Sequence, residues 1–159
     1  MKQKELSRWL RLVVIIGWIA CGLLAFPVAP KLASDAAADF PELNYLAWPC
    51  LAMVWLGLIV VAVALWFGWR IFGEIGRDNS FCRENAHRLR VISHLALADT
   101  VLCIAAILAL LLLHALHPGV LLLMLLIAVI GAGIAVAAAA LSHLTLKAAA
   151  LQDENDLTI

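Results

Sequence analysis

Four apolar segments, each about long enough to cross a lipid bilayer, alternate with polar segments along the chain. They lie at about residues 10–28, 46–70, 91–116 and 119–146. A crossing needs roughly 20 apolar residues, and in lipid a helix satisfies the backbone hydrogen bonds of its own segment. The sequence therefore predicts an all-α integral membrane protein. We expect one domain, residues 1–159, in which four transmembrane helices form two hairpins and pack as a four-helix bundle.

The composition agrees with this class of protein. Of the 159 residues, 65% are hydrophobic and the mean hydropathy is +1.03, whereas a soluble domain is nearer half apolar. The chain has 11 basic and 11 acidic residues. Because these charges balance, nothing in the total predicts direct binding to nucleic acid.

A long polar segment, residues 70–93, separates the two predicted hairpins. Gly73 and Gly76 are expected to end the second transmembrane helix, since glycine commonly follows a helix C-terminus. After a turn, Phe81, Asn85 and Leu89 recur at helical spacing. We therefore expect a short cytosolic helix between the hairpins, with this face packed against the transmembrane helices.

The distribution of lysine and arginine predicts the orientation of the protein. Ten of these residues lie in the N-terminal segment, in the 70–93 loop or at Lys147, and Lys31 is the eleventh. Basic residues accumulate on the cytoplasmic side of bacterial membrane proteins. Both termini and the 70–93 loop are therefore expected in the cytoplasm, and the localisation in the bacterial inner membrane.

Two connections are then expected outside the cell. Residues 28–45 form a polar connection in which Ser34 can cap a short helix, since serine hydroxyls accept from free N–H groups at helix starts. A tight turn at 114–119 connects the second hairpin, because Pro118-Gly119 favours a turn. The fourth helix is expected to continue past the membrane to an acidic tail, residues 152–159.

Asp99 is the acid inside a predicted span, and a carboxylate at that depth is costly enough to suggest a role. At a similar depth, Trp18 could donate its indole N–H, and His143 on the fourth helix lies slightly nearer the cytoplasm. His94 lies five residues away on a different face of the third helix. Two interpretations stay open: a hydrogen-bonded anchor between helices, or part of a proton or ion relay.

Known catalytic and metal-binding patterns are missing from the sequence. It contains no HExxH, GxSxG, P-loop or GxGxxG motif, and His114 and His117 stand without an acid or cysteine beside them. We therefore expect no enzyme activity, no cofactor and no metal site. The fourth segment is rich in small residues, including Gly131, Gly133 and Ala135, which allow helices to approach closely within the chain or in a homo-oligomer.

Several motifs resemble a known family. Ser80-Phe81, Asn85, Arg88-Leu89-Arg90 and the C-terminal Glu154-Asn155-Asp156-Leu157-Thr158-Ile159 are similar to the bacterial membrane proteins of domain of unknown function 2975. The resemblance implies a four-span inner-membrane protein without an established activity. It also implies a frequent genomic neighbour, a small Cro-like helix-turn-helix regulator.

These observations lead to a hypothesis of partner binding. We expect a regulator or tether that binds a cytosolic protein, with a small helix-turn-helix transcription factor as the candidate, while membrane lipids surround the spans. The proposed docking residues are Arg77, Phe81, Asn85, Arg88, Arg90, Glu154 and Asp156. The alternatives are a small transporter or channel subunit that uses Asp99, an oligomeric membrane scaffold, and a lipid-headgroup role for the arginine loop.

Overall fold

The computed structural model describes residues 3–76 and 82–156, and these are helical almost throughout. The elements in chain order are α1 (Gln3–Leu23), the π-helical segment η1 (Leu24–Val28), α2 (Ala29–Asp39), the 3₁₀ turn η2 (Pro41–Leu43), α3 (Asn44–Ile75), α4 (Arg83–Leu112) and α5 (Pro118–Asp156). The described residues contain no β-strand. Four helical stretches are long and apolar enough to cross a membrane: Glu5–Asp39, Pro41–Ile75, Arg83–Leu112 and Pro118–Gln152. The prediction of an all-α membrane protein with four spanning helices in two hairpins is confirmed.

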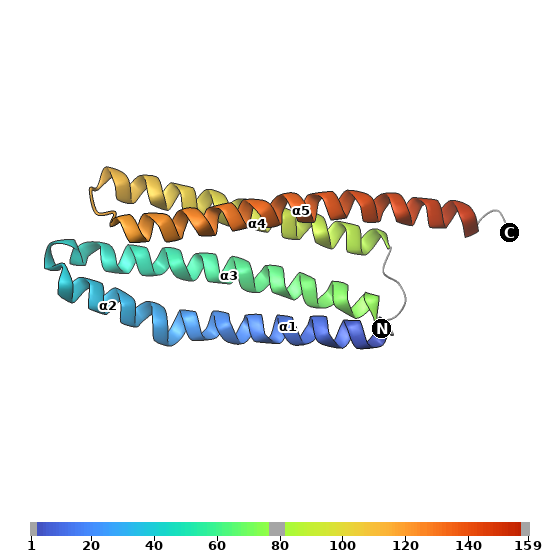
Figure 1. The fold of residues 1–159 in the computed structure, drawn as a ribbon, viewed down its shortest axis with the longest axis horizontal. Coiled ribbons are helices and arrows are strands. Elements are labelled where there is room, and N and C mark those ends of the chain that lie inside the picture. The colour runs from blue at the N-terminus through green and yellow to red at the C-terminus, as the bar shows by residue number, and fades with distance from the viewer. Residues whose placement is uncertain (1–2, 77–81, 157–159) are drawn as a thin grey trace.

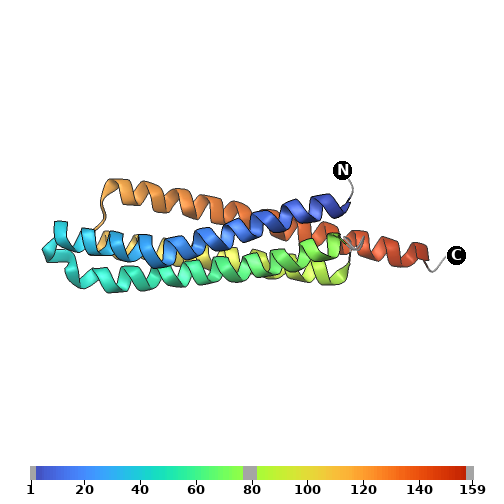
Figure 2. The ribbon, with the colours of Figure 1, turned by 90° about the horizontal axis from the view of Figure 1, so that it is seen from below.

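The four long helices run along the molecule in the packing order α1, α3, α4, α5, and α5 crosses α4 in the view of Figure 1. Each packs on its neighbour in this order, and among the described residues α1 makes no close backbone approach to α4 or α5. The arrangement is therefore an open row rather than the closed bundle that four spans suggest. The view from below shows the same two hairpins, with α5 extending past the other helices (Figure 2).

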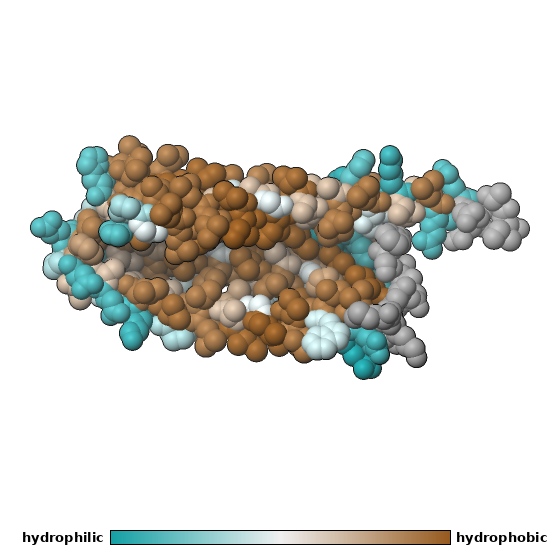
Figure 3. All heavy atoms as spheres, in the orientation of Figure 1, coloured by the Kyte–Doolittle hydropathy of each residue, from teal (hydrophilic) through white to brown (hydrophobic). Residues whose placement is uncertain are grey.

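The two ends of this row differ in character. We call the end with Gln3, Ile75 and Arg83 the basic end, and the opposite end, with residues 40–43 and 113–117, the turn end. Both chain termini lie at the basic end (Figure 1). Figure 3 shows apolar side chains over the long middle of the visible face, with hydrophilic side chains gathered at the two ends. This banded surface is what a protein embedded in a bilayer requires.

The first hairpin differs from the expected polar connection over residues 28–45. Helical backbone continues from α1 through η1 into α2, and the chain reverses only at Phe40–Leu43. Ser34 therefore lies inside α2, where its hydroxyl donates to the Lys31 carbonyl at 2.7 Å, and does not cap a new helix. A π-helical turn accommodates Pro27, which has no N–H for the helical ladder.

Three side chains fix the register of α1 and η1 against α3. Ser7 Oγ donates to the Phe72 carbonyl at 2.7 Å near the basic end, and Trp18 Nε1 donates to the Ala62 carbonyl at 3.3 Å. Nearer the turn end, Trp55 Nε1 donates to the Ala25 carbonyl at 2.9 Å. These bonds tie the two helices together along most of their length.

The second hairpin packs through small residues. Buried positions on α5 recur at intervals of three, four or seven, the pattern of a left-handed helix pair. They are Ala128, Ala135, Ala138, Ser142, Thr145 and Ala149. Side chains on both helices donate to backbone carbonyls across the contact: Ser93 to Ala135 at 2.7 Å, Cys103 to Met124 at 3.4 Å and Ser142 to Ala86 at 2.6 Å. Close backbone approach, expected from the small residues, is thus used within the chain.

The expected separate cytosolic helix is not seen. The polar residues that follow the loop are the first turns of α4, which runs without a break from Arg83 to Leu112. The physical reason is that no glycine or proline occurs between these two residues, so nothing in the sequence ends the helix at the membrane boundary.

Candidate functional site at the basic end

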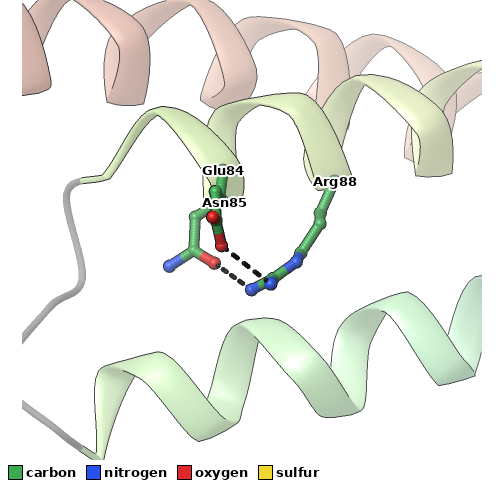
Figure 4. Close-up of polar contacts among 3 residues, drawn as sticks. All are labelled: Glu84, Asn85 and Arg88. Carbon is green, nitrogen blue, oxygen red and sulfur yellow. Dashed lines mark hydrogen bonds and ion pairs between the residues drawn. The ribbon is translucent and has the colours of Figure 1, made fainter.

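Asn85 and Arg88, two residues of the expected docking surface, form part of the fold. Asn85 is 1% exposed, and its Oδ1 accepts a hydrogen bond from Arg88 Nη1 at 3.0 Å. Arg88 Nη2 also contacts Glu84 Oε2 at 3.1 Å. The three side chains lie between α4 and the C-terminal end of α3 (Figure 4). In this conformation Asn85 cannot contact a partner, and the Arg88 side chain is only 15% exposed.

A different face of α4 offers a more accessible site. A pocket of about 180 Å³ lies between the first turns of α4 and the facing part of α5. Its lining residues are Arg83, Ala86, His87, Arg90, Ser142 and Leu146. The two arginines and the histidine are exposed, whereas Ala86 and Ser142 are buried. The site therefore combines a basic rim with a largely apolar floor.

Helical spacing explains why this rim exists. Arg83, His87 and Arg90 occupy positions i, i+4 and i+7, so they share one face of α4. The docking set predicted from sequence contains Arg90 but neither Arg83 nor His87. The helical spacing could have grouped Arg83 and His87 with Arg90. Which face of α4 lies beside α5, however, depends on how the two helices of the hairpin pack. We call these three residues with Ser142 and Leu146 the basic pocket.

The remaining predicted docking residues are at the ends of the described segments. Arg77 and Phe81 lie outside the described residues. Glu154 is exposed on the part of α5 that extends past the other helices, and Asp156 is the last residue of that helix. The C-terminal helix thus carries acidic residues beyond the basic end.

Asp99 lies at the contact between the two hairpins, but not with the expected partners. Its side chain is half-buried, and Oδ1 lies 3.1 Å from where a Cβ on Gly57 of α3 would be. Trp18 donates to Ala62 instead, so the predicted Trp18–Asp99 pair is wrong. His94 and His143 are both exposed. The carboxylate faces Gly57 of α3.

The described residues contain no group of three or more His, Cys, Asp or Glu side chains that could hold a metal ion. The charged and titratable side chains that line the basic pocket are Arg83, His87 and Arg90. An acidic group could enter the basic pocket while an aliphatic neighbour covers Ala86 and Leu146.

Comparisons with known proteins agree with the membrane fold. The model of a family described as "Protein of unknown function (DUF2975)" matches residues 31–159. The chain is similar to an uncharacterized membrane protein, YoaS, of Bacillus subtilis (strain 168). The two are 27% identical over 149 residues, which cover 92% of each chain. No solved structure matches.

Proposed function

This chain belongs to the DUF2975 family, and from that premise we propose that it is a membrane-embedded tether or regulator that binds a cytosolic protein at its basic end. The carrying observation is the basic pocket, an accessible cationic site with an apolar floor, placed beside a helix that extends past the other helices. The turn end offers only short connections, so specific recognition of a protein is better served at the basic end.

The proposal includes an orientation. Lysine and arginine gather at the basic end, and such an excess marks the cytoplasmic side. We therefore place the protein in the bacterial inner membrane with both termini in the cytoplasm. The basic pocket and the C-terminal part of α5 then face cytosolic proteins.

The proposed partner presents an acidic face. Arg83, His87 and Arg90 would pair with carboxylates, and Leu146 would contact an aliphatic side chain of the same partner. The family resemblance supplies the candidate class, a small helix-turn-helix regulator. Asn85 and Arg88 would serve this function indirectly, because their hydrogen bond stabilises the start of α4 beside the end of α3.

Co-purification tests the proposal. The full chain is extracted in detergent with the neighbouring regulator co-expressed, as wild type, Arg90→Glu and Arg8→Glu. Arg8 is an exposed arginine of α1, which makes no close backbone approach to α4 or α5, so its reversal controls for net charge. We expect capture by the wild type and by Arg8→Glu and loss with Arg90→Glu. Equal capture by all three would exclude the basic pocket as the docking site.

The transporter alternative rests on Asp99, a half-buried acid at the contact between the hairpins. It predicts proton or ion flux in liposomes that is lost in Asp99→Asn. Such flux, together with failure to capture the regulator, would replace the tether by the transporter. An oligomeric scaffold would appear instead as a stable multimer of the detergent-extracted chain without either activity.

A further inference from the structure

A stack of aromatic and cationic side chains joins α1 to α3 near the basic end. Trp18 of α1 lies between two tryptophans of α3, with ring centroids 6.1 Å from Trp66 and 6.0 Å from Trp69. The Arg11 guanidinium lies over the Trp69 ring at 5.0 Å, and that of Arg70 over the Trp66 ring at 5.7 Å. Five side chains thus form one stack with a guanidinium at each end. We call it the Arg-Trp stack.

The position of this stack along the helices is that of a membrane interface. Arg11 directly precedes the first apolar segment, and Trp69-Arg70 ends the second. Tryptophan rings favour the level of the lipid headgroups, where one side is apolar and the other is wet. Both guanidinium groups therefore lie where lipid phosphates lie, and not where a cytosolic protein would first make contact.

The Arg11 guanidinium is held in place but is not fully hydrogen-bonded within the described residues. Its Nε is buried and has no hydrogen-bond partner among the described residues. The group is held in place from two sides, by Trp69 and by Gly73, where a Cβ would lie 2.8 Å from Nη2. A guanidinium held in place in this way suits a phosphate oxygen, which arginine binds in a directional way.

We propose that the Arg-Trp stack is a binding site for an anionic phospholipid. Arg11 and Arg70 contact the headgroup phosphate region, and the indoles of Trp66 and Trp69 cover the glycerol and upper acyl chains. The stack lies on the first hairpin, whereas the basic pocket lies between α4 and α5, so the two sites are separate. The lipid would fix the depth of the first hairpin in the bilayer.

Lipid titration of the purified full chain tests this site. Native mass spectrometry measures binding of dioleoyl phosphatidylglycerol and dioleoyl phosphatidylcholine to the wild type, Arg11→Gln, Arg70→Gln and Arg8→Gln. We expect the wild type to prefer the anionic lipid. This preference should be about fivefold weaker in each of the two stack variants, because one basic residue near the membrane surface strengthens binding to anionic lipid by about that factor. Arg8→Gln, one turn away on α1, should keep it.

A second pair of variants separates position from charge. Gly73→Ala keeps both arginines but should push the flexible Arg11 guanidinium from its place, whereas Gly68→Ala meets nothing closer than 3.9 Å. Reduced preference in Gly73→Ala alone supports a built site. A preference that is unchanged in Arg11→Gln and Arg70→Gln, or that falls equally in Arg8→Gln, would overturn the proposal. Displacement of the lipid by millimolar inorganic phosphate would also overturn it, because the site would then be one for a soluble anion.

Discussion

At the scale of single residues, the polar pattern of the loop is explained by structure more than by docking. Asn85 and Arg88 belong to the motif that resembles the family, and the two side chains bond each other where α4 meets the end of α3. A buried amide that accepts from a guanidinium is costly to remove, because the charged partner loses one of its two acceptors. The motif therefore stabilises the joint between the hairpins.

This role predicts an asymmetry between two neighbours that both contact Arg88. Asn85→Ala should lower the free energy of unfolding by about 1–3 kcal/mol, since it leaves Nη1 of a partly buried guanidinium without its acceptor. Glu84→Ala should change it by less than about 1 kcal/mol, because Glu84 is 76% exposed and its ion pair is screened by solvent. Thermal unfolding in detergent measures both variants. Equal losses would show that burial of Asn85 does not govern the joint.

The same scale shows where prediction from sequence stops. Asp99 and Trp18 were expected to meet because their positions in the sequence place them at about the same depth in the membrane. The rotation of each helix about its axis decides whether two side chains meet, and it depends on packing against the neighbours. Here Trp18 turns into the stack with Trp66 and Trp69, and Asp99 faces Gly57. Neither orientation could be read from the apolar segments.

At the scale of elements, the close contact between α4 and α5 depends on a position without a side chain, Gly131 of α5. A Cβ at Gly131 would lie 2.5 Å from Thr100 Oγ1, and that hydroxyl is held by its bond to the Ala96 carbonyl at 2.8 Å. Gly131→Ala should therefore destabilise the protein by about 1–3 kcal/mol through overpacking. The loss is measured as a lower midpoint of thermal unfolding in detergent.

Two comparisons make this prediction specific. Gly133→Ala lies on the same helix with nothing within 4 Å of the added methyl group, so it should be close to neutral. Thr100→Ala removes the hydroxyl that Gly131→Ala would meet, and the double variant should recover most of the loss. A double variant as unstable as Gly131→Ala alone would mean that another contact limits the approach of the helices.

The π-helical segment η1 depends on a side chain from α3. In the π pattern the Ala25 carbonyl would accept from residue 30, but Pro30 has no N–H, and Trp55 Nε1 donates to this carbonyl at 2.9 Å. Trp55→Phe should therefore lower the free energy of unfolding by about 1 kcal/mol. Trp48→Phe is the matched control, because Trp48 is 75% exposed.

A background substitution tests the reason for this loss. Pro30→Ala restores an N–H that can donate to the Ala25 carbonyl, so Trp55→Phe should cost less in that background. Unfolding of the single and double variants in the same detergent gives the coupling between the two positions. A cost that is the same in both backgrounds would show that Trp55 stabilises η1 by packing alone.

At the scale of the whole molecule, the class of fold was predictable and the arrangement of helices was not. Spanning length and hydropathy predict four helices because lipid leaves few alternatives for the backbone. They do not determine which helices touch, and the open row with separated α1 and α5 follows from the pairing of each helix with its sequence neighbour. The small residues on α5 indicated a close contact, and only the structure showed that α4 makes it.

The basic pocket also arises at this scale. It needs the register of α4 against α5, which places Ser142 and Leu146 beside Arg83, His87 and Arg90. Sequence periodicity predicted a polar face on the first turns of α4, but the partner helix could not be known. The predicted docking set and the basic pocket therefore share Arg90, and the pocket adds Arg83 and His87.

The orientation of the molecule is the prediction on which the proposed docking depends. At 1.5 Å per residue, the 39 residues of α5 extend about 58 Å, against a hydrocarbon core of roughly 30 Å. A large part of this helix must therefore leave the membrane, and the basic end determines on which side. Because ten of the 11 lysines and arginines occur in the N-terminal segment, in residues 70–93 or at Lys147, transfer of these segments across the membrane would be strongly disfavoured.

Reporter fusions check this orientation. Green fluorescent protein after Ile159 should fluoresce, since it folds in the cytoplasm, and alkaline phosphatase after Phe40, where the first hairpin turns, should be active outside. The turn is a better fusion point than the middle of residues 28–45, because residues 29–39 are helical. Active phosphatase after Ile159, with an inactive fusion after Phe40, would place the basic end outside. The basic pocket would then be out of reach of every cytosolic protein, and the tether proposal would fail together with the orientation.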